Sequence, residues 1–215
     1  MPSRIFPFVN DHYYHVYNRG VEKRPIFENN WDYTRLSKTM GYYQLLGPKP
    51  KLSKFLVSQL FKPDPDQKIV DIISYCFMPN HFHFLLKQIK DGGITEFVSK
   101  LSNSYTKYYN VKHDRVGPLL QGEFKAALIE NDEQLLHVSR YIHLNPLVSF
   151  LVKDLDDYRW SSYKEYINKE SKDVCAKEDI LSFFKSSKDY RQFVLDQADY
   201  AQQLELIKHH LIDEE

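Results

Sequence analysis

The feature that most constrains this chain is a pair of histidines inside an apolar run. His81 and His83 flank Phe82 within the stretch from Tyr75 to Leu86, which otherwise has the composition of a buried strand. Alternate residues of a strand share a face, so both imidazoles should lie on one face while Phe82 points into a core. Two imidazoles on a rigid strand are a suitable platform for a divalent metal ion. A bare His-x-His pattern also fits ordinary half-exposed strand residues.

Length and charge bound the possible functions. The 215 residues suffice for one sizeable core with an added helical tail. With 29 basic and 29 acidic residues, the net charge gives no global argument for a nucleic-acid partner. The charge is uneven, because residues 171–215 hold 6 basic and 10 acidic side chains. The abundant aromatic residues, 16 Tyr and 14 Phe, suit both a core and base stacking.

Cysteine content and hydropathy predict the compartment. Cys76 and Cys175 are the only cysteines, which excludes a disulfide framework and a thiolate zinc cluster. No stretch approaches the length of a membrane span, and the N-terminal residues lack a signal-peptide pattern. We therefore expect a cytoplasmic, soluble protein with no membrane partner.

The order of predicted elements indicates the fold class. The strands are predicted over residues 13–19, 69–77, 81–87 and 124–129. The helices are predicted over residues 30–46, 96–112 and 133–144. Thr95 is expected to cap the second helix, Asn131 or Asp132 the third, and Pro146 to stop the third. This order predicts an α+β sandwich in which helices cover a mainly antiparallel sheet on one side.

Two regions fall outside that core pattern. Residues 48–67 have prolines at both ends and look like an insertion. Residues 158–166 and 177–207 are polar with helical character, which predicts a helical C-terminal extension. We expect a catalytic domain over residues 1–170, with the insertion, followed by the extension over residues 171–215.

A second group of chemically useful residues lies on the last predicted helix. Tyr141 and Asn145 are four residues apart and therefore share a helical face. From the edge of the buried stripe they can face the strand that carries His81 and His83. A phenol, a carboxamide oxygen and two imidazoles would then converge, a set that can bind a cation and leave positions open for phosphate oxygens. The alternatives are a packing aromatic at Tyr141 and a helix C-cap at Asn145.

Together these motifs resemble the single-tyrosine HUH transposases, and among them the REP-associated tyrosine transposases. The strand motif from Met78 to Leu86 and the helix motif from Arg140 to Leu147 carry the resemblance. Further matches run from Tyr14 to Gly20, from Gly117 to Gly122 and from Trp160 to Tyr163. The resemblance covers roughly residues 10–165.

The resemblance implies a ferredoxin-like or RRM-like sandwich and a metal-dependent endonuclease and strand transferase for single-stranded DNA. His81, His83 and Asn145 would bind Mg²⁺ or Mn²⁺. Tyr141 would cleave the strand and keep a 5′-phosphotyrosine link, which a freed 3′-hydroxyl later reverses. No organic cofactor is expected.

The resemblance also implies a DNA partner, an imperfect hairpin with a short single strand beside it. His15, Asn18 and Arg19 are candidate DNA contacts, since Arg19 can pair with a phosphate or a guanine edge. Glu123 stands where the family pattern leads us to expect a basic residue, which removes a phosphate contact. Either a monomer or a homodimer with tyrosines exchanged between subunits is compatible with the resemblance.

Two other functions are compatible with the same residues. One is a domesticated relative that binds hairpin DNA without productive transposition, which the zero net charge and Glu123 favour. The other is a small metal hydrolase that uses His81 and His83 without Tyr141. His137 and His143, on the tyrosine helix, are interpreted as surface or sheet-edge residues and are left out of the site. The presence of the whole set of chemical residues favours the transposase.

Overall fold

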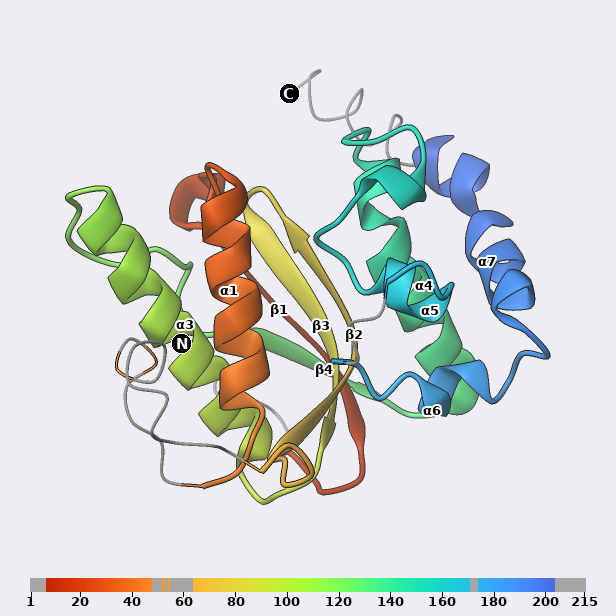
Figure 1. Cartoon of the computed structure of the whole chain (residues 1–215), viewed down its shortest axis with the longest axis horizontal. Helices are drawn as coiled ribbons and strands as arrows, with labels where there is room; N and C mark the ends of the chain where they lie inside the picture. Colours follow the sequence, from red (N-terminus) through yellow and green to blue (C-terminus); the bar gives the residue numbers. More distant parts are fainter. Residues whose placement is uncertain (1–6, 48–51, 53, 55–63, 171–173, 204–215) are drawn as a thin grey trace.

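The computed structural model describes residues 7–47, 52, 54, 64–170 and 174–203. Most of the predicted insertion, residues 48–51, 53 and 55–63, lies outside these residues, as does the end of the C-terminal extension. Three layers are visible, with a central sheet between two groups of helices (Figure 1). Within the part that the structure describes, no helix combines the length and apolar character needed to cross a membrane.

A four-stranded antiparallel sheet forms the middle layer. Its strands are β1 (Tyr13–Arg19), β2 (Val70–Met78), β3 (His81–Gln88) and β4 (Lys125–Ile129), in the order β2-β3-β1-β4. In the β1–β3 register Arg19 lies opposite His81 and Tyr17 opposite His83. Because opposed residues of an antiparallel pair point to the same face, the odd-numbered side chains of both strands share one face. The predicted antiparallel sheet is confirmed.

Helices cover both faces of this sheet. The helices are α1 (Asn30–Tyr43), α3 (Gly93–Lys112), α4 (Asp132–Val148), α5 (Tyr163–Tyr166), α6 (Glu178–Leu181) and α7 (Ser187–Leu195), with single 3-10 turns at Val21–Lys23 and Leu155–Asp157. In Figure 1, α1 and α3 cover one face and α4 covers the other, with α5, α6 and α7 beside it. The expectation that helices lie on one side is therefore wrong. Eight of the nine residues of β2 are buried, so neither of its faces can be left to solvent.

The boundaries of α3 and α4 differ from those predicted. Thr95 lies inside α3, which begins at Gly93 after a glycine with φ of 69° at position 92. Asn131 caps α4 as expected, with its side-chain oxygen accepting from the backbone N–H of Gln134 at 2.8 Å. Pro146 does not stop α4, which continues to Val148. A proline in the last turn removes one intrahelical hydrogen bond and leaves the rest of that turn in place.

The C-terminal region consists of short helices that pack on α4. The predicted helical stretch over 177–207 is interrupted between α6 and α7, where Ser186 caps α7 by accepting from Asp189. Tyr190 and Val194 of α7 are fully buried. The Tyr190 hydroxyl contacts Ser139 Oγ at 2.8 Å and His143 Nδ1 at 2.7 Å, both on α4. This part of the chain therefore completes the core behind α4.

His143 lies in the contact between α4 and α7 and is fully buried. Its Nε2 lies 2.8 Å from Ser162 Oγ, so both ring nitrogens have polar partners inside the protein. Of the two positions expected for His143, solvent is therefore wrong, whereas the sheet edge is consistent with its partner Ser162, which accepts a hydrogen bond from Tyr75 of the edge strand β2. The burial follows from the docking of Tyr190 and Ser162, which are distant in sequence.

We expect His143 to make stability fall in mild acid. Burial lowers the pKa of His143 from 6.5 to about 3. Between these values the unfolded chain binds a proton that the folded chain does not, so the free energy of unfolding decreases as the pH falls below 6.5. Removal of this group by His143→Gln should reduce the loss of stability between pH 7 and pH 5 by about 2 kcal/mol.

Urea unfolding at both pH values measures this difference. The control is Ser139→Ala, which removes the other α4 partner of the Tyr190 hydroxyl without removing a titratable group, and should keep the wild-type pH dependence. Equal pH dependence in the wild type and in His143→Gln would contradict the assignment.

Candidate functional site

Two imidazoles and one phenol meet on the sheet face that α4 covers. His15 of β1 and His83 of β3 are joined through Nε2 and Nδ1, which are 3.0 Å apart. The Tyr141 ring of α4 stands edge-on to both, with centroid distances of 5.4 Å to His83 and 5.8 Å to His15. Within one chain, sheet register and helix packing thus bring the tyrosine to the imidazoles.

His81 continues this group along β3. Its ring lies 4.9 Å from that of His83, at right angles to it. The Nδ1 of His81 lies 2.6 Å from Asn80 Oδ1, and Asn80 donates from Nδ2 to the Lys23 carbonyl at 3.0 Å. Because a carboxamide oxygen only accepts, His81 carries its proton on Nδ1 and presents the lone pair of Nε2. Such an oriented imidazole is what a metal ligand requires.

Tyr141 differs from most tyrosines of this protein in its exposure. Half of its surface is accessible, whereas Tyr105, Tyr163 and Tyr190 are almost completely buried. The alternative interpretation of Tyr141 as a packing aromatic does not explain why half of this residue is accessible to solvent beside two histidines. Half of the Tyr141 residue is therefore accessible to an incoming substrate.

Asn145 lies one turn after Tyr141 and faces the same space. Its Nδ2 donates to the Tyr141 carbonyl at 2.8 Å, which turns the carboxamide oxygen away from the helix backbone. The alternative interpretation of Asn145 as a helix C-cap is wrong, because α4 continues to Val148 and Ser149 is its C-cap. The structure thus brings together the four predicted catalytic and metal-binding residues, His81, His83, Tyr141 and Asn145.

The histidines of the site are neutral at physiological pH. Burial lowers the pKa of His15 and, together with the charge of Arg19, that of His81, in each case to about 4. Burial, with its two histidine neighbours, lowers the pKa of His83 well below 6.5. Neutral imidazoles have the lone pair that metal coordination needs, so binding of a cation here does not compete with protonation at pH 7.

A groove of about 490 Å³ opens beside these residues. His81 of β3, residues of α4 that include Tyr141 and Asn145, and residues of the C-terminal segment line it. The further lining residues are His137, Arg140, Leu144, Val148, Ser149, Gln197 and Ala201. Among the described residues that line this groove none is acidic, which suits a negatively charged substrate.

The donor atoms fit a divalent cation with open coordination positions. Two imidazole nitrogens and one carboxamide oxygen are ligand types that Mn²⁺ and Mg²⁺ accept, although Mg²⁺ prefers oxygen. The described residues contain no group of three or more His, Cys, Asp or Glu side chains able to hold a metal. Among the described residues, a third protein ligand beside His81 and His83 would therefore be a side chain of another type, such as the carboxamide of Asn145. His83 keeps Nε2 for a metal when its Nδ1 donates to His15.

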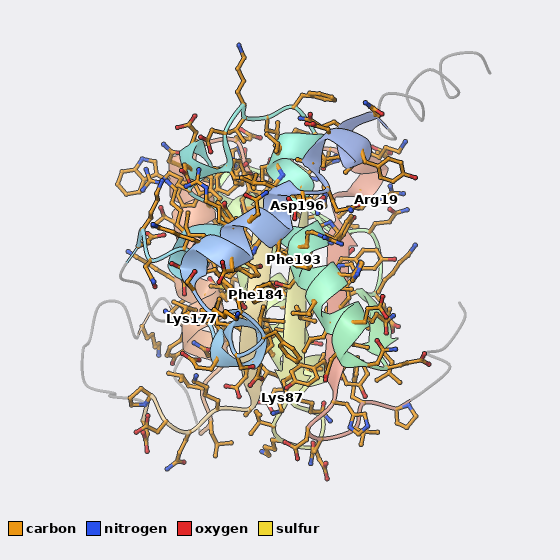
Figure 2. All side chains as sticks on the ribbon, turned by 90° about the vertical axis from the view of Figure 1, so that its right-hand side faces the viewer. Arg19, Lys87, Lys177, Phe184, Phe193 and Asp196 are labelled. Atoms are coloured by element: carbon orange, nitrogen blue, oxygen red, sulfur yellow. The ribbon has the colours of Figure 1, made fainter. Side chains whose placement is uncertain are left out.

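The three candidate DNA contacts on β1 are separated by the structure. His15 belongs to the histidine group. Asn18 points to the opposite face, is 7% exposed, and lines a second groove of about 730 Å³ together with Glu123. Arg19 is exposed and donates from Nε to Gln121 Oε1 at 2.7 Å. Figure 2, which views the molecule from the side of α4 and α7, shows Arg19 near the upper right of that face.

Sequence reasoning missed the contact of His15 with His83 and the position of His137 and Arg140 in the groove wall. The first depends on which strands pair, and the pairing of β1 with β3 cannot be read from either strand alone. The second had a signal, since His137 lies four residues before Tyr141 and three before Arg140, the spacings of neighbours on a helix surface.

Comparison with protein families identifies the chain. The model of the family described as "Transposase IS200 like" matches residues 8–145, well over half of the sequence. The chain belongs to the IS200-like transposase family. The resemblance seen in its motifs is thereby confirmed, and its class is that of the DNA transposases.

One solved structure shows the same fold. A REP-associated tyrosine transposase bound to a REP hairpin has a TM-score of 0.57 and 14% identity, over 81% of this chain and 93% of that one. A putative transposase from Deinococcus radiodurans R1 has a TM-score of 0.37 and 12% identity, over 66% of this chain and 95% of that one. The second likeness is too weak to carry an argument. A search of the curated proteins finds no match.

The orientation of His81 by Asn80 leads to a prediction about metal affinity. In Asn80→Ala the ring of His81 loses the acceptor that fixes its tautomer, so we expect the affinity for Mn²⁺ to fall by about 10-fold. Isothermal titration with MnCl₂ measures this, with thermal unfolding as a check of the fold. Asn110→Ala is the matched control, because Asn110 bonds to the Gly117 carbonyl away from the site. An unchanged affinity in Asn80→Ala would contradict the role of this contact.

Proposed function

We propose that this transposase is a metal-dependent endonuclease and strand transferase that acts on single-stranded DNA beside a hairpin. The main support is the half-exposed phenol of Tyr141 standing against His83 of the same chain. Phosphoryl transfer to a tyrosine needs a reactive hydroxyl next to oriented imidazoles. Here the tyrosine also lines a groove whose described lining residues include no acidic side chain.

His81, through Nε2, His83 and the carboxamide oxygen of Asn145 would hold the cation. When bound, a divalent ion supplies charge stabilisation for the phosphate oxygens and the leaving oxygen. The chain itself positions these groups: Asn80 orients His81, His15 orients His83, and the Tyr141 carbonyl orients Asn145. Each proposed ligand thus makes a hydrogen bond that fixes its orientation, and two of them, His81 and Asn145, line the groove.

Tyr141 would act as the nucleophile. Its phenolic oxygen forms a bond to the scissile phosphorus, the bond from phosphorus to the 3′ oxygen breaks, and the leaving strand ends in a 3′-hydroxyl. The phenolic proton leaves as the new bond forms, and the half-exposed position of the ring gives that proton access to water. The product is a 5′-phosphotyrosine, and attack by a 3′-hydroxyl restores a phosphodiester, so strand transfer needs no ATP.

Hairpin DNA is the proposed partner because a transposase of the same fold is bound to a REP hairpin. At 14% identity this likeness supports the fold alone, so the partner is our proposal. The histidines and Tyr141 come from one chain, which supports a site that works without exchange of tyrosines between subunits.

Tyr141→Phe should abolish covalent adduct formation, by at least about 100-fold, because the ring stays but the attacking oxygen is gone. The assay incubates a labelled DNA hairpin carrying a randomised single-stranded flank with Mn²⁺ or Mg²⁺, and detects protein-linked DNA on a denaturing gel. EDTA should also abolish the adduct. Tyr43→Phe, a substitution of a half-buried tyrosine of α1 on the opposite face of the sheet, is the matched control and should keep wild-type activity.

The outcomes separate the candidate functions. Cleavage that persists in Tyr141→Phe would contradict the tyrosine mechanism and favour a metal hydrolase. Hairpin binding by the wild type with no cleavage and no adduct under any metal would favour the DNA-binding role without transposition.

A mixing experiment tests whether each site belongs to one chain. Tyr141→Phe and His83→Ala should both be inactive, and their mixture should remain inactive if Tyr141 serves the histidines of its own chain. Adduct formation restored in the mixture would show that the tyrosine is donated by a partner subunit and would contradict the single-chain site. Each variant mixed with wild-type protein controls for inhibition.

A further inference from the structure

Arg140 is a cation of the groove wall to which the proposed mechanism gives no role. It directly precedes Tyr141 in the chain and lines the same groove. Its Nη1 donates to the Phe193 carbonyl at 3.3 Å and its Nη2 to His137 Nδ1 at 3.0 Å. A guanidinium has five N–H donors, so three of them have no acceptor among the described residues.

Helix α7 holds this guanidinium in place. The Phe193 ring lies against it, with 4.3 Å from Cζ to the ring centroid, and the carbonyl of the same residue accepts from it. Figure 2 shows Phe193 on α7 and Asp196 just after its end, next to α4. A guanidinium that is stacked and hydrogen-bonded at once has lost much of its rotational freedom, so a further ligand can bind it at low entropic cost.

The charge of Arg140 is not neutralised by an ion pair within the described part of the chain. Burial lowers its pKa, and the charge of Asp196 opposes this from beyond ion-pair distance. The other described residues that line the groove include the amides Asn145 and Gln197, and none of them is acidic. A fixed, partly buried cation with free N–H groups beside a nucleophilic tyrosine is suited to an oxygen anion of the substrate.

We propose that Arg140, held by Phe193, binds a DNA phosphate next to the scissile one, so that the groove between α4 and residues 197–201 is the path of the single strand. The proposal rests on the proposed function, because it takes Tyr141 as the point at which the strand is cut. It assigns the C-terminal extension a direct part in the substrate site.

The test measures whether the loss of the Arg140 side chain and the loss of one phosphate charge have coupled effects on binding affinity. Proteins carry Tyr141→Phe, so that the DNA stays intact, and bind a fluorescein-labelled DNA hairpin with a single-stranded thymidine flank. A series of such probes replaces each flank phosphate in turn by an uncharged methylphosphonate. Fluorescence anisotropy over a range of salt concentrations gives the affinity and its salt dependence.

Arg140→Gln should weaken binding by about 10-fold and lower the magnitude of the logarithmic salt slope by about one. A methylphosphonate at one flank position should weaken binding to Arg140 protein by a similar factor and have no further effect on Arg140→Gln, because the two changes remove the same contact. Arg140→Lys, which keeps the charge without the planar fork, should recover part of the affinity.

Lys188→Gln is the matched control for charge. Lys188 is exposed on the first turn of α7 and does not line the groove, so its removal should leave the effect of every methylphosphonate unchanged. Thermal unfolding of each variant verifies the fold, and the recovery by Arg140→Lys separates a binding role from a purely structural one.

The proposal would be overturned if the losses of affinity caused by Arg140→Gln and by a methylphosphonate were additive at every flank position. Absence of DNA binding by the Tyr141→Phe protein that retains Arg140 would also overturn it. The outcome is distinct from that of the adduct assay. Coupling between Arg140 and a phosphate in a protein that forms no adduct would support this contact and contradict the tyrosine mechanism. Formation of the adduct without such coupling would support the tyrosine mechanism and contradict the contact between Arg140 and a phosphate.

Discussion

The alternation of side chains along β3 is the constraint on which the rest of this structure depends. It directs His81 and His83 to one face and Phe82 and Phe84 to the other. The phenylalanine face is closed by α3, where Phe84 meets Phe97 at 5.7 Å. The histidine face is closed by α4, which brings Tyr141. A shift of one residue in the register would exchange the two faces and disperse the site.

The position of α4 depends on parts of the chain beyond the family match, which ends at residue 145. His143 is held by Ser162 on one side and Tyr190 on the other, and all three are buried. Because the buried face of α4 is fixed in this way, its opposite edge presents Tyr141 and Arg140 to the groove in a defined orientation. The C-terminal helices thus support the site through the helix that they pack against.

The sequence predicted what depends on local pattern. The four strands, the antiparallel sheet and the shared face of the two histidines follow from alternation and turns, and the shared helical face of Tyr141 and Asn145 follows from their spacing. The prediction that Pro146 ends the helix was wrong, because a proline breaks a helix in its interior but is tolerated in the last turn. The burial of His143, the contact of His15 with His83 and the fixing of Arg140 by Phe193 are non-local. Each depends on packing that no single segment encodes.

The proposed mechanism requires a cation bound by His81 and His83 within reach of Tyr141. Anomalous diffraction from crystals grown with Mn²⁺ tests this most directly. The expected result is one strong peak within coordination distance of His81 Nε2 and of a His83 ring nitrogen, on the side that faces Asn145 and the Tyr141 hydroxyl. A manganese peak elsewhere in the protein, with none at these histidines, would contradict the account.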